Sequence, residues 1–244
     1  MSTAILITGT DTGVGKTVVT AGLATALRRR GINAGVMKPV ATGCVRDENG
    51  DFLSPDTEFL CAVTGVEDPY FMVTPVCLEP ALAPAAAART SGVTGVVEDM
   101  RQSFHDLMER HPVLLVEGVG GFLVPLDDET LLADFAGKLA MTVLIVARCG
   151  LGTINHTLLT IEAVRARGLR IAGLVFNHAS ADDSDASAAT NPGEIERFAG
   201  VHMLGTLPFE AGLSVENCTP GRLVELVEQH LDVEGFIRRE CRGE

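Results

Sequence analysis

The chain has 244 residues and a formal net charge of −13, with 19 Lys and Arg against 32 Asp and Glu. An acidic surface repels phosphodiester backbones and anionic lipids, so this charge argues against nucleic-acid and membrane partners. The composition is 46% hydrophobic and 21% charged, which is typical of a sheet that helices cover on both faces. No apolar run approaches the roughly 18 residues that cross a bilayer, and no linker-like stretch divides residues 1–244, so we expect a single α/β domain.

The six cysteines show no pattern of a metal site or a disulfide framework. No Cys-x-x-Cys pair occurs, and no histidine stands at metal-ligand spacing from a cysteine. The N-terminus lacks a charged region followed by a long apolar stretch, so no signal peptide is expected. We therefore expect a reduced, cytoplasmic protein.

A glycine-rich loop joins the first expected strand to the first expected helix. Residues 4–8 are apolar and β-prone, and residues 18–27 carry apolar side chains at helical spacing. The loop between them, Gly9 to Thr17, matches a phosphate-binding loop with one extra residue. Its glycines let backbone N–H groups approach phosphate, Lys16 supplies positive charge, and the Thr17 hydroxyl can bind Mg²⁺. A chance Gly-Lys-Thr string in a surface loop is the alternative, but the placement between strand and helix argues against it.

The rest of the chain alternates strands and helices. Strands are expected over residues 34–38, 113–116, 143–147 and 171–176, and helices over residues 56–63, 96–110, 154–167 and 219–239. The connections are expected to be a polar working loop (42–55), a proline-rich irregular stretch (68–84), a glycine-rich turn (118–121) and an acidic surface loop (180–191). This alternation predicts a doubly wound, mainly parallel sheet, whose ligands bind beyond the carboxyl ends of the strands.

Three charged residues stand near such expected strand ends. Lys38 ends the second strand, so its ammonium group can reach the phosphate site, although a solvated strand-end lysine is the alternative. Glu117 follows the strand over residues 113–116 and places a carboxylate beside the loop. Asp56 begins a helix, where it can be the N-cap, a magnesium ligand or both. Because Mg²⁺ prefers oxygen ligands, Thr17, Asp56 and Glu117 predict a magnesium site.

A second strand-to-helix turn spans residues 150–156, with two glycines. The free N–H groups at the start of a helix can hold an anion there. His156 lies in the first helical turn, where a histidine is more often packed or hydrogen-bonded than catalytic.

These motifs together resemble the dethiobiotin synthetase family. They are the loop from Gly9 to Thr17, Lys38-Pro39-Val40 with Thr42-Gly43, Val116-Glu117-Gly118 with Gly120-Gly121, and Gly152 to His156. The motifs follow the family's order over roughly residues 4–210, including the long phosphate loop. The resemblance implies the fold of P-loop NTPases.

The resemblance also implies an ATP- and Mg²⁺-dependent ligase of biotin biosynthesis. Such an enzyme closes the ureido ring of dethiobiotin from 7,8-diaminononanoate and CO₂. One amine takes up CO₂ as a carbamate, ATP phosphorylates the carbamate oxygen, and the second amine displaces phosphate. The residues fit this chemistry, because the enzyme mainly positions reactants and stabilises charge on phosphoryl oxygens.

By the same resemblance, Lys16 and Lys38 would be the catalytic cations, and Thr17, Asp56 and Glu117 would surround Mg²⁺. The family is homodimeric, and the turn over residues 150–156 would bind the substrate carboxylate in the partner's active site. Substrate contacts would come from Thr12, Thr42, Gly152, Thr153 and Asn155. ATP would contact the phosphate loop and further strand ends, through Gly13, Val14, Gly15, Lys16, Thr17, Val18, Asp56, Glu117, Gly118, Val119, Gly120, Asn177, Leu207, Pro208, Phe209 and Glu210.

The main alternative is a nucleotide switch of the partitioning or metal-cluster-carrier kind, which has the same fold. Such switches place a signature lysine five residues before the P-loop lysine, and Asp11 occupies that position here. A carboxylate has the wrong charge to contact phosphate. A protein that binds nucleotide only to regulate a partner would not need Lys38, Asp56 and Glu117 together.

Overall fold

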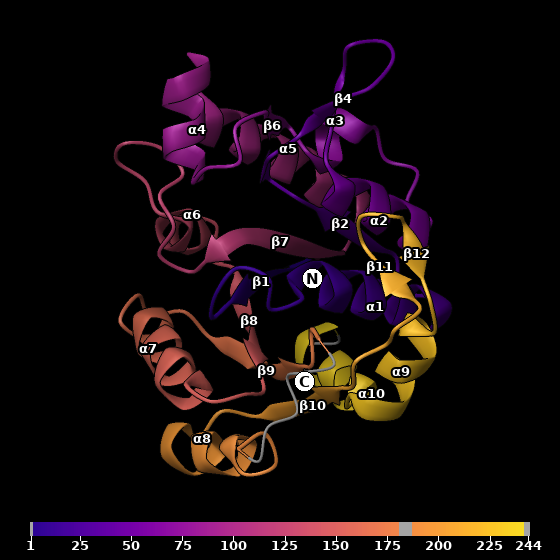
Figure 1. The fold of residues 1–244 in the computed structure, drawn as a ribbon, viewed down its shortest axis with the longest axis vertical. Helices are drawn as coiled ribbons and strands as arrows, with labels where there is room; N and C mark the ends of the chain where they lie inside the picture. The colour runs from indigo at the N-terminus through magenta and orange to yellow at the C-terminus, as the bar shows by residue number, and fades with distance from the viewer. Residues whose placement is uncertain (1, 181–186, 242–244) are drawn as a thin grey trace.

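The computed structural model describes residues 2–180 and 187–241. Its centre is a six-stranded parallel sheet with the strand order β10-β9-β8-β1-β7-β2 (Figure 1). These strands are β1 (Thr3–Gly9), β2 (Ala34–Met37), β7 (Val113–Gly121), β8 (Thr142–Arg148), β9 (Ile171–Asn177) and β10 (Met203–Leu207). The prediction of a doubly wound, mainly parallel α/β sheet is confirmed.

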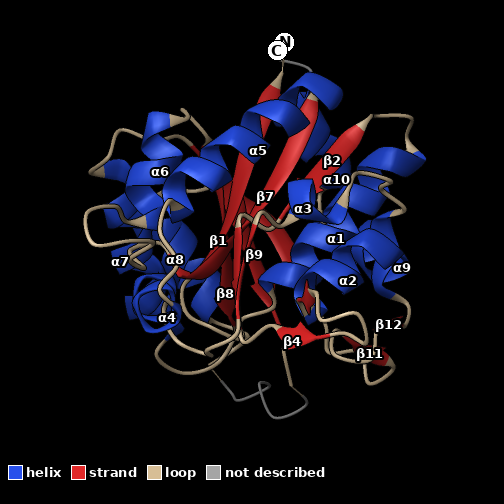
Figure 2. Cartoon of the chain, turned by 90° about the horizontal axis from the view of Figure 1, so that it is seen from above, coloured by secondary structure: helices blue, strands red, loops and turns tan. Residues whose placement is uncertain are grey.

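Helices cover both faces of this sheet (Figure 2). One face packs against α4 (Pro84–Ser91), α5 (Val96–Arg110), α6 (Leu132–Lys138), α7 (Thr153–Arg165) and α8 (Asn191–Ala199). The opposite face packs against α1 (Lys16–Arg29), α2 (Pro55–Thr64), α9 (Leu223–His230) and α10 (Val233–Phe236). Strand side chains alternate between the two cores, since Leu6 faces the first core and Ile5 and Ile7 face the second. Burial on both faces explains why the strands are apolar throughout.

Short strands and a short helix lie between the main elements of the fold. Two strands, β3 (Val40–Thr42) and β6 (Val76–Leu78), pair in parallel, and a short helix α3 (Tyr70–Val73) lies between them in the chain. Two antiparallel hairpins are formed by β4 (Val45–Arg46) with β5 (Phe52–Leu53) and by β11 (Leu213–Ser214) with β12 (Thr219–Pro220). The expected acidic loop over residues 180–191 lies partly outside the described residues, and α8 begins at Asn191.

Strand β7 is longer than the sequence analysis expects. The segment from Gly118 to Gly121 belongs to the strand, so the prediction of a turn there is wrong. Gly121 pairs with Gly9 of β1, after a register irregularity between Ile7 and Gly9. Pairing with a neighbouring strand satisfies the backbone groups of these glycines, which outweighs their weak intrinsic preference for strands.

The prediction of a single helix over residues 219–239 is wrong, because residues 219 and 220 form β12, and α9 spans only Leu223–His230. Leu231 forms a bridge with Gly205 of β10, and the Asp232 N–H donates to the Leu204 carbonyl over 2.8 Å. The chain resumes as α10, which Asp232 caps by accepting from the Gly235 N–H, and ends in a π-helical turn, Ile237–Cys241. Pairing with the sheet edge therefore interrupts the helix.

In the part of the chain that the structure describes, no two cysteines are joined by a disulfide bond. Within residues 2–180 and 187–241, every helix is too short or too polar to cross a membrane.

Replacement of Gly205 by alanine tests how closely the backbone of β10 approaches the segment between α9 and α10. Gly205 has a φ of +141°, and a β-carbon there would lie 2.0 Å from the His230 carbonyl oxygen. We expect Gly205→Ala to lower the free energy of unfolding in urea by about 3 kcal/mol, because the backbone must shift. Gly137→Ala in α6 is the control, since a β-carbon there meets no atom within 4 Å. Equal stability of the two variants would contradict the close approach.

Candidate active site

The phosphate-binding loop leaves β1 and enters α1 at Lys16, as the sequence predicts. Gly15 has a φ of +95°, a left-handed conformation that glycine adopts without strain. The Asn177 amide at the end of β9 donates from Nδ2 to the Val14 carbonyl over 3.0 Å. A β-carbon at Gly15 would lie 2.1 Å from the same nitrogen. The Asn177 side chain therefore holds the loop in place and leaves no room for a side chain at position 15.

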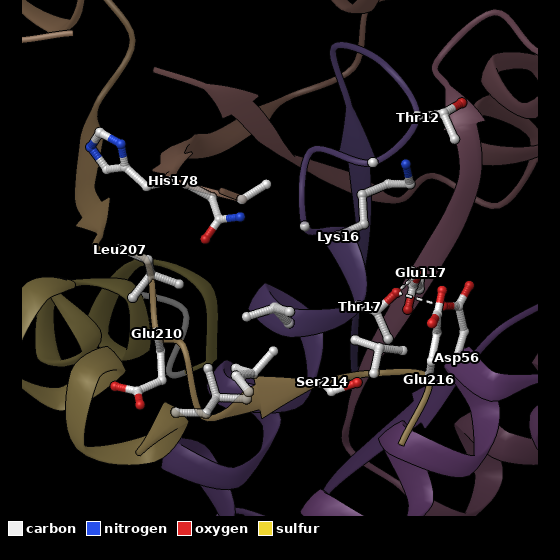
Figure 3. Close-up of a pocket in the computed structure, with 18 of the residues that line it drawn as sticks. Thr12, Lys16, Thr17, Asp56, Glu117, His178, Leu207, Glu210, Ser214 and Glu216 are labelled. Carbon is white, nitrogen blue, oxygen red and sulfur yellow. Dashed lines mark hydrogen bonds between the residues drawn. The ribbon is translucent and has the colours of Figure 1, made fainter. Parts of the chain in front are cut away.

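The Lys16 side chain folds back along this loop. Its Nζ donates to the Asp11 carbonyl over 3.2 Å, and the Asp11 carboxylate in turn pairs with Arg148 at 2.5 Å. Burial and the neighbouring Lys38 ammonium lower the pKa of Lys16 to about 8. Lys16 thus places its ammonium group in the same pocket as Thr17 (Figure 3).

Lys38, Asp56 and Glu117 form a buried ion cluster. Lys38 follows β2, and its Nζ donates to Asp56 Oδ2 and to Glu117 Oε1, each at 2.6 Å. Thr17 Oγ1 lies 3.1 Å from Asp56 Oδ1 and 2.8 Å from Glu117 Oε1, and Figure 3 shows these three side chains pointing toward one another. The exposed fractions of the side chains are 5% for Lys38, 0% for Glu117 and 37% for Asp56. Asp56 is therefore the member that faces the open pocket.

The two carboxyl groups of the cluster stabilise the charge of the Lys38 ammonium ion. Burial lowers the pKa of Lys38, but the Glu117 and Asp56 carboxylates outweigh burial and hold this pKa above its usual value. Burial raises the pKa of Asp56, but Lys38 outweighs it and holds this pKa below its usual value. Burial also raises the pKa of Glu117, against the effect of Lys38. The floor of the pocket thus carries an ammonium ion whose charge the carboxyl groups stabilise.

Asp56 is not the N-cap of α2. Ser54 is the N-cap and Pro55 the first helical residue, so Asp56 stands second in the helix. Its carboxylate bonds Lys38 and Thr17 instead of the helix backbone. The N-cap interpretation of Asp56 is therefore wrong.

The oxygen atoms of Thr17, Asp56 and Glu117 fit a magnesium ion. Glu117 Oε2 is buried and has no hydrogen-bond partner, which leaves a carboxylate oxygen available as a ligand. Mg²⁺ keeps several waters and binds phosphate oxygens, so one or two carboxylates are sufficient. Across the described residues, no three His, Cys, Asp or Glu side chains are grouped to hold a metal ion. The ion would thus depend on nucleotide phosphates for the rest of its coordination.

These groups line a cavity of about 590 Å³, a size typical of ligand pockets. Most of the site residues expected from the sequence line it: Thr12, Gly13, Gly15, Lys16, Thr17, Val18, Lys38, Thr42, Asp56, Glu117, Val119, Gly120, Asn177, Leu207, Pro208, Phe209 and Glu210. Val14 and Gly118 do not. The Val14 side chain is buried in the core, and Gly118 lies inside β7, where a β-carbon would be 2.7 Å from Leu132.

The cavity is also lined by three further segments that the sequence does not point to. They contribute His178 and Ala179 after β9, Leu213, Ser214, Val215 and Glu216 in and after β11, and Leu223 and Leu226 of α9. Of these, His178 alone carries a signal in the sequence, because it follows Asn177 at the end of a strand. Glu210 lines the cavity, but its carboxylate pairs with Arg222 at 2.9 Å and accepts from the Gly212 N–H. Glu210 therefore also fixes the loop that carries it.

The turn over residues 150–156 does not line this cavity. Gly152 is the N-cap of α7 with a φ of +91°, and the buried Thr153 hydroxyl donates to the Arg148 carbonyl over 2.7 Å. The Thr153 hydroxyl is thus occupied within the turn. Leu151 is 84% exposed, and a second cavity of about 410 Å³ lies beside α7, with Asp11 and His156 in its lining.

Proteins of similar sequence share one name. A family model described as an AAA domain matches residues 3–217. A protein of Anaeromyxobacter dehalogenans (strain 2CP-C) is 42% identical over 210 residues, which cover 86% of this chain and 92% of that protein. One of Thermodesulfovibrio yellowstonii is 33% identical over 244 residues, covering 97% and 99%, and one of Bacillus subtilis (strain 168) is 36% identical over 227 residues, covering 93% and 94%. All three are named ATP-dependent dethiobiotin synthetase.

Solved structures show the same fold. A chain of the MinC:MinD cell division protein complex of Aquifex aeolicus has a TM-score of 0.59 at 17% identity, covering 100% of this chain and 97% of that chain. A ParA family ATPase from Chlorobium tepidum has a TM-score of 0.57 at 13% identity, covering 94% and 98%. At these identities the likeness concerns the fold alone, so it lends no weight to a switch function. The sequence relatives decide the family, and this chain belongs to the ATP-dependent dethiobiotin synthetases.

Proposed function

We propose that this protein is a cytoplasmic, homodimeric ligase that converts 7,8-diaminononanoate, CO₂ and ATP into dethiobiotin, ADP and phosphate. Membership of the family supports an ATP-dependent ligase of biotin biosynthesis. One observation carries the proposal: Lys16, Thr17 and the buried ion cluster all line the same cavity. Two cations beside a set of oxygen ligands suit a transfer of a phosphoryl group.

Thr12 and Thr42 would bind the diamine or the carbamate formed from CO₂ and one of its amines. Both residues line the cavity. A hydroxyl group can donate to a carbamate oxygen or accept from an amine, so it serves both forms of the substrate. Thr42 ends β3, which directly follows Lys38 and Pro39, so it would bring the carbamate close to the cation.

Lys16 and the loop amides would hold the phosphates of ATP, while Asn177 and the segment from Leu207 to Glu210 would flank the adenine. Lys38 would stabilise the charge that develops on the transferring phosphoryl group and on the carbamate oxygen. Bound Mg²⁺, held by Thr17, Asp56 and Glu117, would neutralise charge on the phosphate oxygens. The second amine would then displace phosphate from the mixed carbamic–phosphoric anhydride and close the ring.

The turn over residues 150–156 would act in the partner's active site. Gly152 and Asn155 stand at the exposed start of α7, beside the exposed Leu151. Helix N-terminal N–H groups favour an anion without a basic side chain. The main chain of this turn, with Asn155, would therefore bind the substrate carboxylate across a two-fold interface.

A direct assay tests the function. Purified protein is incubated with ATP, Mg²⁺, bicarbonate and 7,8-diaminononanoate, and dethiobiotin is measured by mass spectrometry. We expect one ADP for each dethiobiotin, and neither product when the diamine is left out. ATP hydrolysis without dethiobiotin would contradict the ligase proposal and favour a nucleotide switch.

Replacement of Lys38 by methionine tests the second cation. Methionine keeps much of the length and removes the charge, so we expect turnover to fall about a hundredfold, because the charge developing on the phosphoryl oxygens is left uncompensated. The ATP affinity should change little, since Lys16 and the loop remain. Lys138→Met, at the exposed end of α6, is the matched control. Turnover of Lys38→Met within twofold of the control would show that Lys38 is not catalytic.

Mixing two inactive variants tests the shared active site. One carries Lys38→Met and the other Gly152→Trp, which would obstruct the turn. With shared sites, a mixed dimer has one site with both defects and one with neither, so an equal mixture should recover about a quarter of wild-type activity. No recovery, with subunit exchange shown by mass spectrometry, would mean that each subunit builds its site alone.

A further inference from the structure

The first turn of α2 is bound to the segment over residues 70–74 by hydroxyl groups. The backbone N–H of Ser54, the N-cap, donates to the Tyr70 Oη over 2.6 Å. One turn further, Thr57 Oγ1 and Thr74 Oγ1 lie 2.6 Å apart. Ser54, Thr57 and Thr74 are all buried, with exposed fractions of 3%, 0% and 3%. Tyr70 and the pair of Thr57 with Thr74 are called the hydroxyl clamp below.

The hydroxyl clamp replaces a local cap that α2 lacks. In a capping box, a Glu or Gln at the third helical position accepts from the N–H of the N-cap residue. Here the third position is Thr57, whose hydroxyl contacts Thr74, and Ser54 makes no side-chain cap bond. A buried N–H needs an acceptor. Tyr70, the only tyrosine of the chain, supplies it from a different element.

The two contacts of the clamp bracket Asp56. Asp56 lies between Ser54 and Thr57 in the same helical turn, so its carboxylate is aimed by the backbone that the clamp holds. The same segment also holds Lys38, because the Lys38 N–H donates to the Val73 carbonyl over 2.8 Å. One short stretch of chain thus sets the positions of two members of the buried ion cluster.

Asp56 needs such support more than its partners do. Glu117 belongs to β7 in the middle of the sheet, and Lys38 directly follows β2. Asp56 comes from a helix outside the sheet and is the most exposed member of the cluster. Its aim toward Thr17 and Lys38 thus depends on how α2 begins.

We propose that Tyr70 is a positioning residue that, with Thr57 and Thr74, holds Asp56 in place for magnesium binding. This inference rests on the metal site of the proposed function. Tyr70 does not line the cavity, so it acts on the site through the residues that it holds in place. A residue that orients a metal ligand in this way changes the affinity of the site for the metal ion.

The test measures metal binding without turnover. Mn²⁺ binding in the presence of ADP is followed by electron paramagnetic resonance for the wild type, Tyr70→Phe and Thr74→Val, each of which removes one hydroxyl. We expect both variants to bind Mn²⁺ about tenfold more weakly, while ADP affinity without metal stays within twofold. In the assay, the Mg²⁺ concentration at half-maximal rate should rise, and the rate at saturating Mg²⁺ should recover.

The control is Thr64→Val, at the other end of α2. The Thr64 hydroxyl is buried and donates to the Leu60 carbonyl over 2.6 Å, so its loss perturbs the same helix away from Asp56. We expect Thr64→Val to keep wild-type Mn²⁺ affinity. Asp56→Asn gives the size of the effect when the ligand charge itself is removed.

Unchanged Mn²⁺ affinity of folded Tyr70→Phe would overturn the proposal. Equal weakening by Thr64→Val would also overturn it, because the effect would then be a general loosening of α2. If Tyr70→Phe does not fold, as judged by circular dichroism, Thr74→Val decides by the same criterion. A wild type that binds Mn²⁺ with ADP but makes no dethiobiotin would contradict the proposed function only, whereas a wild type that binds no Mn²⁺ would overturn the positioning role.

Discussion

The active-site floor depends on the burial of one ammonium ion between two carboxylates. Taking each ion out of water costs several kcal/mol, so Lys38 is stable there only while Asp56 and Glu117 stay within hydrogen-bond distance. Removal of one partner would leave an uncompensated charge in the interior. The segments that carry these residues must therefore lie together whenever the protein is folded. Formation of the ion cluster is thus coupled to folding.

The parallel sheet makes this meeting possible. Its strands end at one edge, where β1 leads into the phosphate loop, β2 into Lys38 and β9 into Asn177. The clamp of Asn177 on Val14 ties the loop to β9, which is two strands away from β1 in the sheet. The loop conformation therefore depends on the register of the sheet as well as on its glycines. This arrangement presents N–H groups and cations at the edge where a doubly wound fold binds its ligands.

The two ends of the cavity have different origins. The phosphate end is built from the central strands, whose backbone hydrogen bonds and two apolar cores hold it rigidly. The other end is built from the segment after β10 and the β11–β12 hairpin, which is two residues long in each strand. A short hairpin has few contacts of its own, so it holds this end of the cavity less firmly than the central strands hold the other end.

The phosphate loop, with Lys16 and Thr17, and the strand-end position of Lys38 could be predicted from the sequence. Their signals are local, because a strand, a glycine-rich turn and a helix start follow one another within a few residues. The apolar strands likewise predicted a parallel sheet covered on both faces. The roles of Thr12, Thr42 and Asn155 came from resemblance to a family and stay predictions.

The length of β7, the break at Leu231 and the surroundings of Asp56 depend on contacts between distant segments and could not be predicted. Gly121 is a strand residue because Gly9 pairs with it, and the last helix breaks because Leu231 bridges to Gly205. Asp56 faces Lys38 because a tyrosine 14 positions later in the sequence holds the start of its helix. Each of these outcomes depends on a contact with a residue that is distant in the sequence. Local sequence patterns therefore cannot predict it.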